Sequence, residues 1–310
     1  MINDENLPLV SIVTPTYNQA RYLEETIQSV LQQDYPNIEY IVLNDGSTDE
    51  TEEILKKYDG QIIWESHENI GQTPTINKGW RLSQGQIIAY INSDDTYIVP
   101  DAIRKGVEFL LANPDVAVVY GDAYEIDESG KIVKYHSAPD CDFTALVKNW
   151  IRTLNWQIVQ PSTFIRREIL DEVGYLDPSI YYAMDLEYWL RIGTKNFKIA
   201  HLAEPLSCYR LHSESKTVST HAKNAPDFVN IYNKIFERSD LPKEFRDLRR
   251  QAKSGAYLRT AKAYHAALDY EQSRHYMLKG FSIYPPNISW IWLKRLLVTY
   301  FKQGSPQHLG

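Results

Sequence analysis

The chain has 310 residues, of which 43% are hydrophobic and 24% charged, a composition typical of a folded protein with about two domains. This composition excludes a largely disordered, collagen-like or disulfide-scaffold chain, and no run of about eighteen apolar residues predicts a transmembrane helix. The start MINDENLPLV lacks the basic and apolar regions of a signal peptide, and the two cysteines, Cys141 and Cys208, suit a reducing compartment. We therefore expect a cytoplasmic protein.

Charge is distributed unevenly along the chain. Residues 1–220 contain 18 Lys and Arg against 33 Asp and Glu, whereas residues 221–310 contain 15 against 7. An acidic segment repels a phosphate backbone, so we expect no nucleic acid partner. The change in charge near residue 220 coincides with the start of long helical stretches. It predicts a boundary between a first domain at 1–220 and a helical region at 221–310.

Apolar strand patterns alternate with helical patterns over residues 9–120. The apolar runs are short and end at polar, Pro or Gly turns, and the helical segments repeat apolar side chains every three or four residues. This alternation predicts an α/β fold with a mostly parallel, doubly wound sheet that is covered by helices. Strands are expected at 9–14, 38–43, 61–65, 87–91 and 116–120, and helices at 21–33, 48–57, 73–82 and 100–112.

The pattern is mixed from residue 122 to about 210 and helical after Ser219. Residues 244–283 predict a helical hairpin that is similar to one tetratricopeptide-type unit. The alternative is a pair of helices packed on the first domain, and a single unit favours it because stacked repeats need about three copies. Further strands are expected at 133–136, 198–202 and 206–209, and further helices at 167–173 and 186–193.

Residues 287–302 combine large apolar and aromatic side chains with Lys294, Arg295 and Lys302. An aromatic, basic helix can lie at a membrane interface. A core helix or the interface of a homodimer is the alternative. Both remain open, so we expect either peripheral contact of residues 286–302 with the inner face of the cell membrane or a homodimer.

Polar clusters follow three of the predicted strands, at 14–18, 44–47 and 92–95. In doubly wound sheets, ligands bind outside the carboxyl ends of the strands. We therefore expect these clusters to converge in one cleft.

Two of the clusters contain acids with alternative interpretations. Asp94 and Asp95 could bind Mg²⁺ or Mn²⁺ together with substrate phosphates, or they could form a solvated turn that caps the next helix. Asp45 precedes Gly46, which allows close approach of the backbone. Its carboxylate could accept hydrogen bonds from a base or a ribose, or it could belong to an ordinary turn.

Three residues near the end of the first domain also carry chemistry. Asp185 lies at a predicted helix start, where it could be a general base or only complement the helix dipole. His212 could ligate a metal and Arg210 could bind phosphate, although a single His is more often structural.

Gly79 interrupts a helical pattern, which indicates that packing or a ligand requires a glycine there.

The sequence lacks a Walker phosphate loop, a G-x-G-x-x-G after the first strand and a G-x-S-x-G elbow. These absences weaken the kinase, dehydrogenase and hydrolase interpretations.

Taken together, the motifs resemble the family 2 glycosyltransferases, which have the nucleotide-sugar-binding fold called GT-A. The resemblance covers roughly residues 8–215, and its stretches occur in the family's order and spacing. The stretches are VSIVTPTYNQARYLEETIQSVLQQDYPNIEYIVLNDGSTDET, ENIGQTPTINKGW, GQIIAYINSDDTYIVPDAI, EVGYLDPSIYYAMDLEYWLRI and YRLHSES.

This resemblance implies a metal-dependent, inverting transfer of a sugar from a nucleoside-diphosphate sugar, UDP-linked by expectation. The acceptor would be a hydroxyl of a glycan or of a lipid-linked molecule, in cell-surface polysaccharide or glycolipid synthesis. It implies Mn²⁺ or Mg²⁺ as cofactor, with Asp95 as ligand and His212 approaching the metal or diphosphate, and Asp185 as catalytic base. The implied nucleotide-binding residues are Thr14, Pro15, Tyr17, Asn18, Asp45 (base), Asn77 and Asp94 (ribose).

Three residues depart from the family pattern. Asn44 and Asn92 stand where the family often has Asp, and Met184 replaces the Glu of a Glu-Asp motif. The Asn-Ser-Asp-Asp form also resembles a recurring subgroup, so we do not interpret it as loss of activity. The alternatives are a sugar-nucleotidyltransferase, which usually has a Gly-rich first loop, and a non-catalytic protein that binds nucleotide sugars.

Overall fold

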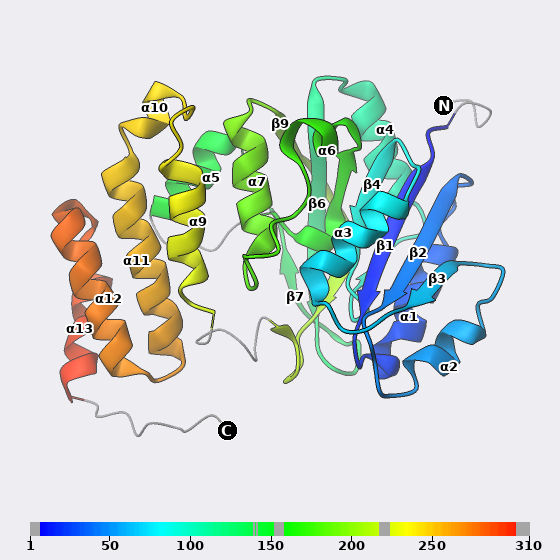
Figure 1. Cartoon of the computed structure of the whole chain (residues 1–310), viewed down its shortest axis with the longest axis horizontal. Coiled ribbons are helices and arrows are strands. Elements are labelled where there is room, and N and C mark those ends of the chain that lie inside the picture. The colour runs from blue at the N-terminus through cyan, green and yellow to red at the C-terminus, as the bar shows by residue number, and fades with distance from the viewer. Residues whose placement is uncertain (1–6, 139, 141, 152–157, 217–223, 302–310) are drawn as a thin grey trace. The chain divides into compact units, whose positions relative to one another are not determined.

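The computed structural model describes residues 7–138, 140, 142–151, 158–216 and 224–301 (Figure 1). Cys141 and the residues beyond 301 lie outside this part. The chain divides into two compact units. The first contains 1–142, 157–178 and 195–212, and the second contains 143–156, 179–194 and 213–310.

The first unit contains a single curled sheet in its described part. Its strand order is β3-β2-β1-β4-β8-β6-β9-β5, and β7 pairs with β6. The strands are β1 (Val10–Thr16), β2 (Ile38–Asn44), β3 (Ile63–Ser66), β4 (Ile87–Tyr90), β5 (Thr96–Tyr97), β6 (Val116–Ile126), β7 (Ile132–His136), β8 (Thr163–Arg166) and β9 (Lys198–Arg210).

The half of the sheet formed by the first strands is parallel, as the sequence predicts. β1 pairs in parallel with β2 and β4, and β2 pairs in parallel with β3. All residues of β1 and β4 are buried, because helices cover both faces of this part of the sheet. The helices of this unit are α1 (Ala20–Leu31), α2 (Thr51–Lys56), α3 (Gln72–Leu82), α4 (Ala102–Ala112), which packs on β6, β8 and β9, and α6 (Glu168–Val173).

Two features of this sheet differ from the sequence prediction. β1 continues through Pro15, which pairs in register with Leu43, because a proline fits an extended chain where its missing N–H is not required. β9 is one strand and not two. Its register against β6 shifts where Leu202 opposes Gly121 and Pro205 opposes Asp122, so the intervening residues are accommodated as an irregularity.

Gly79 has a packing reason. A Cβ atom at this position would overlap the side chain of Val13, so α3 approaches β1 closely enough that only glycine fits. Gly106 on α4 meets the ring of Phe164 on β8 in the same way.

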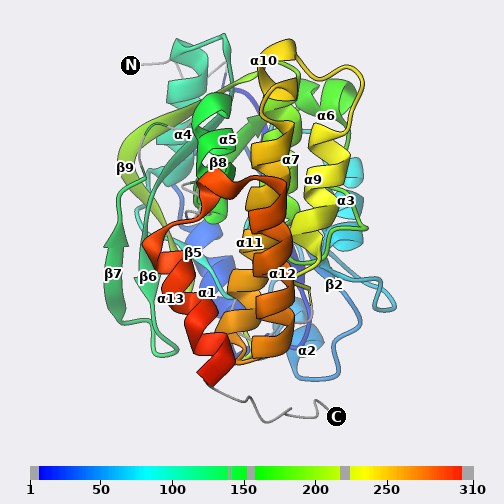
Figure 2. The ribbon, with the colours of Figure 1, turned by 90° about the vertical axis from the view of Figure 1, so that its left-hand side faces the viewer.

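The second unit is helical in its described part. Its helices are α5 (Phe143–Ile151), α7 (Met184–Thr194), α9 (Asp227–Phe236), α10 (Lys243–Arg246), α11 (Arg249–Ala266), α12 (Tyr270–Ile283), the short 3-10 helix η3 (Pro285–Asn287) and α13 (Trp290–Phe301). Figure 2 shows α11, α12 and α13 side by side, in agreement with their contacts. The predicted hairpin is present, and Asp269 caps α12 by accepting a hydrogen bond from the Gln272 N–H.

Two segments upstream of residue 220 pack in this helical unit, so the compact units interleave in sequence. The Trp150 indole on α5 is buried and donates to the Ala252 carbonyl on α11 at 3.0 Å. Gly193 on α7 lies directly against the ring of Phe143. Large aromatic side chains from before and after residue 220 therefore pack in one helical core. The predicted domain boundary near residue 220 would divide this core. Among the described residues, no helix is both long and apolar enough to cross a membrane.

Candidate functional site

The three predicted polar clusters lie at the same edge of the sheet, where β1, β2 and β4 end. The Asn18 N–H donates to Ser47 Oγ at 2.9 Å, and Asn18 Oδ1 accepts from the Thr48 N–H at 2.8 Å. Gln72, at the start of α3, donates to Asn92 Oδ1 at 2.8 Å. These contacts join the loops after β1 and β2 to each other, and the start of α3 to the loop after β4.

The Asp45 carboxylate binds the backbone of the loop that leads into α3. Its Oδ1 accepts from the Ile70 N–H at 2.7 Å, and its Oδ2 accepts from the Gly71 N–H at 2.9 Å. Asp45 is buried, and His67 Nδ1 lies 3.5 Å from Oδ1. Gly46 must be glycine, because its φ is +76° and a Cβ there would lie 2.8 Å from the Asn69 nitrogen.

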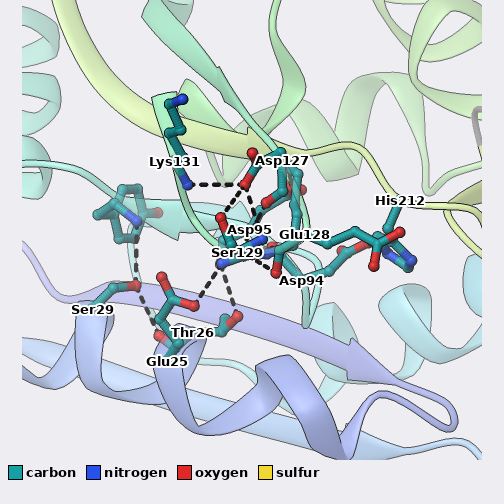
Figure 3. A network of polar contacts seen from close by, with 12 residues as sticks. Glu25, Thr26, Ser29, Asp94, Asp95, Asp127, Glu128, Ser129, Lys131 and His212 are labelled. Carbon is teal, nitrogen blue, oxygen red and sulfur yellow. Dashed lines mark hydrogen bonds and ion pairs between the residues drawn. The ribbon is translucent and has the colours of Figure 1, made fainter. Parts of the chain in front are cut away.

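The neighbouring acids Asp94 and Asp95 have different partners (Figure 3). Asp94 Oδ2 lies 3.0 Å from Nε2 of the buried His212 side chain. Asp95 is buried, with Oδ1 accepting from the Arg210 N–H at 3.0 Å and Oδ2 accepting from the Asn92 amide at 3.0 Å. Burial and the adjacent charge of Asp94 raise the pKa of Asp95 well above its ordinary value, while the Arg210 and Asn92 hydrogen bonds oppose that rise.

Arg210 holds this region together. Its buried guanidinium donates to the Asp94 carbonyl at 3.1 Å, to the Asp127 carbonyl at 3.2 Å and to Glu25 Oε2 at 2.6 Å. Its central carbon also lies 4.8 Å from the centre of the Tyr22 ring. The sequence suggested phosphate binding, but these contacts use the guanidinium to position the loop that carries Asp94 and Asp95.

Asp185 lies in the second unit, in the first turn of α7. Its Oδ1 accepts from the Leu186 N–H at 2.8 Å. Burial raises the pKa of Asp185, whereas the Leu186 hydrogen bond and the positive charge of Lys216 lower it. Residue 184 is a methionine and carries no charge. The positive charge that acts on the Asp185 carboxylate comes from Lys216.

Lys216 belongs to the same group of ionisable residues. Its Nζ lies 4.2 Å from the centre of the Tyr181 ring. Burial lowers the pKa of Lys216 to about 8, although the charges of Asp185 and Asp227 act to raise it. Asp227 in turn accepts the N–H groups of Tyr181 and Tyr182 at 2.9 and 2.7 Å. Lys216 could not be recognised from sequence, because a lysine in the polar run SESKT is typical of a solvated loop.

The remaining predicted nucleotide-binding residues fall into two groups. Tyr17 and Asn18 are exposed after the end of β1, whereas Thr14 and Pro15 are buried within the strand. Thr14 Oγ1 pairs with Tyr40 Oη at 3.0 Å. Asn77 is buried and uses both ends of its amide on the Leu176 backbone, at 2.8 and 3.0 Å. We therefore interpret Thr14 and Asn77 as residues that support the site.

A divalent cation is implied by the resemblance, and the residues present fit it in part. Among the described residues, no group of three or more His, Cys, Asp or Glu side chains is arranged to hold a metal ion. Asp94 Oδ2 and His212 Nε2 form a hydrogen bond of 3.0 Å, and this distance is also the spacing of two adjacent ligands in an octahedron with bonds of about 2.1 Å. Mg²⁺-type ions commonly use one or two protein ligands and complete their shell with substrate phosphates and water. The pair therefore suits a cation that arrives with a diphosphate.

Comparisons with known proteins agree with the fold. The family described as Glycosyl transferase family 2 matches residues 11–174. The "Uncharacterized glycosyltransferase MJ1057" of Methanocaldococcus jannaschii is 28% identical over 250 residues, 74% of this chain and 85% of that protein. The "Putative teichuronic acid biosynthesis glycosyltransferase TuaG" of Bacillus subtilis is 32% identical over 214 residues, 67% of this chain and 81% of that protein. The chain spans 32% of the length of a longer glycosyltransferase from Rickettsia bellii.

Solved structures share the fold at low sequence identity. TarS 1-349 of S. aureus in complex with UDP-GlcNAc has a TM-score of 0.57 at 16% identity, over 95% of this chain and 92% of that one. The mannosyltransferase PcManGT of Pyrobaculum calidifontis, in complex with GDP-Man and Mn²⁺, has a TM-score of 0.58 at 18% identity, over 97% and 88%.

The sheet and its covering helices form a GT-A-like α/β fold, as the sequence predicts. The chain belongs to glycosyl transferase family 2 and is a glycosyltransferase.

Proposed function

We propose that this chain transfers a sugar from a nucleoside-diphosphate sugar, UDP-linked in the simplest case, to a hydroxyl of a glycan or lipid-linked acceptor, with inversion at the anomeric carbon. The complexes of TarS with UDP-GlcNAc and of PcManGT with GDP-Man support a nucleotide sugar as donor. The name of TuaG supports cell-surface polysaccharide or glycolipid synthesis as the setting. We propose that residues 1–220 form the catalytic region. We also propose that the protein acts in the cytoplasm or at the inner face of the cell membrane.

We assign the nucleobase to the loops that carry Tyr17, Asn18 and Asp45. The exposed ring of Tyr17 offers an apolar face to a base. Asp45 already accepts two backbone N–H groups, and a carboxylate retains lone pairs for a further donor such as a base N–H. The buried strand residues Thr14 and Pro15 support this edge from below.

We assign the diphosphate to the region of Asp94, Asp95 and His212. A bound Mn²⁺ or Mg²⁺ would offset the negative charge that develops on the leaving diphosphate. Asp94 and His212 are proposed to hold the ion, because their facing oxygen and nitrogen atoms have the spacing of adjacent ligands. Asp95 has both oxygens bonded to Arg210 and Asn92, so we propose that it orients Asp94. This differs from the resemblance, which makes Asp95 the ligand and Asp94 the ribose contact.

We propose Asp185 as the general base. In this role its carboxylate takes the proton from the acceptor hydroxyl while that oxygen attacks the anomeric carbon on the face opposite the leaving diphosphate. A single displacement of this kind inverts the configuration. Burial supports the assignment, because a raised pKa makes the carboxylate a stronger base.

The pair formed by Asp94 and His212 at the carboxyl end of β4, within the family's fold, is the observation that carries the proposal. The test is release of nucleoside diphosphate from UDP-, GDP- and dTDP-sugars with MnCl₂ or with chelator, in the presence of simple glycosides as acceptors. We expect one donor to be consumed only with the metal. Binding of a nucleotide sugar without any release would identify a non-catalytic binding protein. Consumption of a sugar phosphate and a nucleoside triphosphate would identify a sugar-nucleotidyltransferase.

A further inference from the structure

The last helix of the second unit, α13, leaves most of its apolar side chains in solvent. Trp292 and Thr299 are buried against the rest of the unit. The residues on the opposite side are exposed: Trp290 by 66%, Leu293 by 39%, Leu297 by 52%, Tyr300 by 57% and Phe301 by 83%.

These five residues, which we name the α13 stripe, form one continuous face. Their spacings of three, four and seven residues place them on the same side of an α-helix. An exposed apolar face of this kind in a folded protein marks an interaction surface. It does not serve the hydrophobic core of the unit, which uses Trp292 together with Leu258, Ala261, Met277 and Phe281.

The charge around the stripe has one sign. On α12 and α13, the described residues 272–301 contain Arg274, Lys279, Lys294 and Arg295 and no acid. Lys294 lies on the edge of the stripe, with its Nζ 5.5 Å from the centre of the Trp290 ring. On α12, the Arg274 guanidinium lies 4.8 Å from the Tyr300 ring and donates to the Thr299 carbonyl at 3.0 Å. Cations therefore border the stripe from two helices.

We propose that α13 is an interfacial helix that binds the surface of an anionic lipid bilayer, with the α13 stripe among the lipid headgroups and acyl chains. Aromatic side chains are favoured at that depth, and basic residues beside them attract anionic lipids. The occupant is a membrane surface and not a second copy of the chain, because a twofold contact through the stripe would bring two strongly basic surfaces together. This inference does not depend on the proposed transfer reaction, and either can fail alone.

Flotation of the full-length chain with liposomes tests the proposal. One set of vesicles is pure phosphatidylcholine, and the other contains about one third phosphatidylglycerol. We expect the chain to float with the anionic vesicles and to remain behind with the neutral ones. High salt should weaken the binding, because it screens the attraction of the basic residues.

Two exposed leucines provide a matched pair of variants. Leu297→Glu places a charge in the stripe, whereas Leu278→Glu places the same charge on the exposed face of α12, where Leu278 is exposed to a similar degree. Both side chains lie in solvent, so both variants should keep the thermal stability of the parent. Leu297→Glu should lower partitioning onto anionic vesicles by about tenfold or more, and Leu278→Glu should lower it much less.

Three results would overturn the proposal. The first is failure of the parent chain to float with anionic vesicles. The second is equal partitioning of the parent and Leu297→Glu, or an equal loss in both variants. The third is a dimer in analytical ultracentrifugation that Leu297→Glu alone converts to monomer, which would make the stripe a contact between copies.

Discussion

His212 and Asp94 are separated by 118 positions in the sequence and joined by a 3.0 Å contact between Nε2 and Oδ2. His212 follows the end of β9, and Asp94 lies in the loop between β4 and β5. Arg210 positions the two side chains relative to each other, because its backbone N–H donates to Asp95 and its guanidinium donates to the Asp94 carbonyl. The strand that ends at Arg210 therefore brings an imidazole to the loop after β4.

Removal of the imidazole should weaken metal use. His212→Gln should raise the Mn²⁺ concentration required for half-maximal donor turnover by at least about tenfold, because a nitrogen ligand is lost from the proposed pair. The measurement is nucleoside diphosphate release at varied MnCl₂. His275→Gln is the matched control, because His275 is exposed on α12 in the second unit. An unchanged metal requirement in His212→Gln would remove His212 from the role.

Asn substitutions at the two adjacent acids should have different effects. Asp94→Asn should shift the Mn²⁺ requirement as much as His212→Gln, because the oxygen that faces the imidazole loses its charge. Asp95→Asn should instead lower turnover by a similar factor at every metal concentration, because it disturbs the position of the loop that carries Asp94. The opposite pattern would restore Asp95 as the ligand and is measured in the same titration.

Asp185→Asn should lower kcat by about 10²–10⁴, the usual contribution of general-base catalysis. In the parent enzyme, kcat should fall as pH decreases through the pKa of Asp185, because the protonated carboxyl cannot accept the hydroxyl proton. Burial raises that pKa above its ordinary value of 3.8, so the acid limb of the pH profile should lie above pH 3.8. A kcat unaffected by the substitution would contradict the assignment.

Lys216→Met should move the same acid limb to higher pH, since the positive charge of Lys216 lowers the pKa of Asp185. Lys216→Arg retains the charge and is the control. Stability provides a second readout. The folded pKa of Lys216, about 8, lies below its ordinary 10.5, so its favourable contribution is present above pH 10.5 and is lost as pH falls through 8. The parent should therefore gain Tm relative to Lys216→Met as pH rises from 7 towards 10.5. A difference in Tm between the two proteins that stays constant from pH 7 to 10.5 would show that burial does not lower the pKa of Lys216.

Gly79→Ala should destabilise the chain by about 1–3 kcal/mol, because the added methyl overlaps the buried Val13 side chain. Denaturant unfolding gives the free energy of unfolding. Lys78→Ala, at the neighbouring half-buried position on α3, removes an ion pair with Glu65 and should cost at most about 1 kcal/mol. Equal stability of Gly79→Ala and the parent would show that α3 can move away from β1.

The alternation of strands and helices in the first third of the chain could be predicted from hydrophobic periodicity, because each buried strand there is a distinct apolar run. β5 and β8 could not, because they have two and four residues and show no periodicity. The placement of α5 and α7 in the helical unit also escaped prediction. It depends on contacts such as Trp150 with Ala252, which join residues 102 positions apart.

The candidate site was predictable in its residues and not in its pairing. Sequence motifs indicated Asp94, Asp95 and His212, but adjacent side chains in a turn point in different directions. Only the folded loop determines that His212 meets Asp94 while Asp95 binds the Arg210 backbone. In the same way, Arg210 is a plausible phosphate ligand in sequence, and only its burial and its carbonyl partners identify it as a positioning residue.

A crystal structure of the full chain with UDP or GDP and MnCl₂ tests the central claim most directly. We expect a Mn²⁺ ion held by both Asp94 and His212 beside the diphosphate, with the base beside Asp45. An ion that contacts neither Asp94 nor His212, including one held by Asp95 instead, or a nucleotide bound at another edge of the sheet, would contradict this assignment.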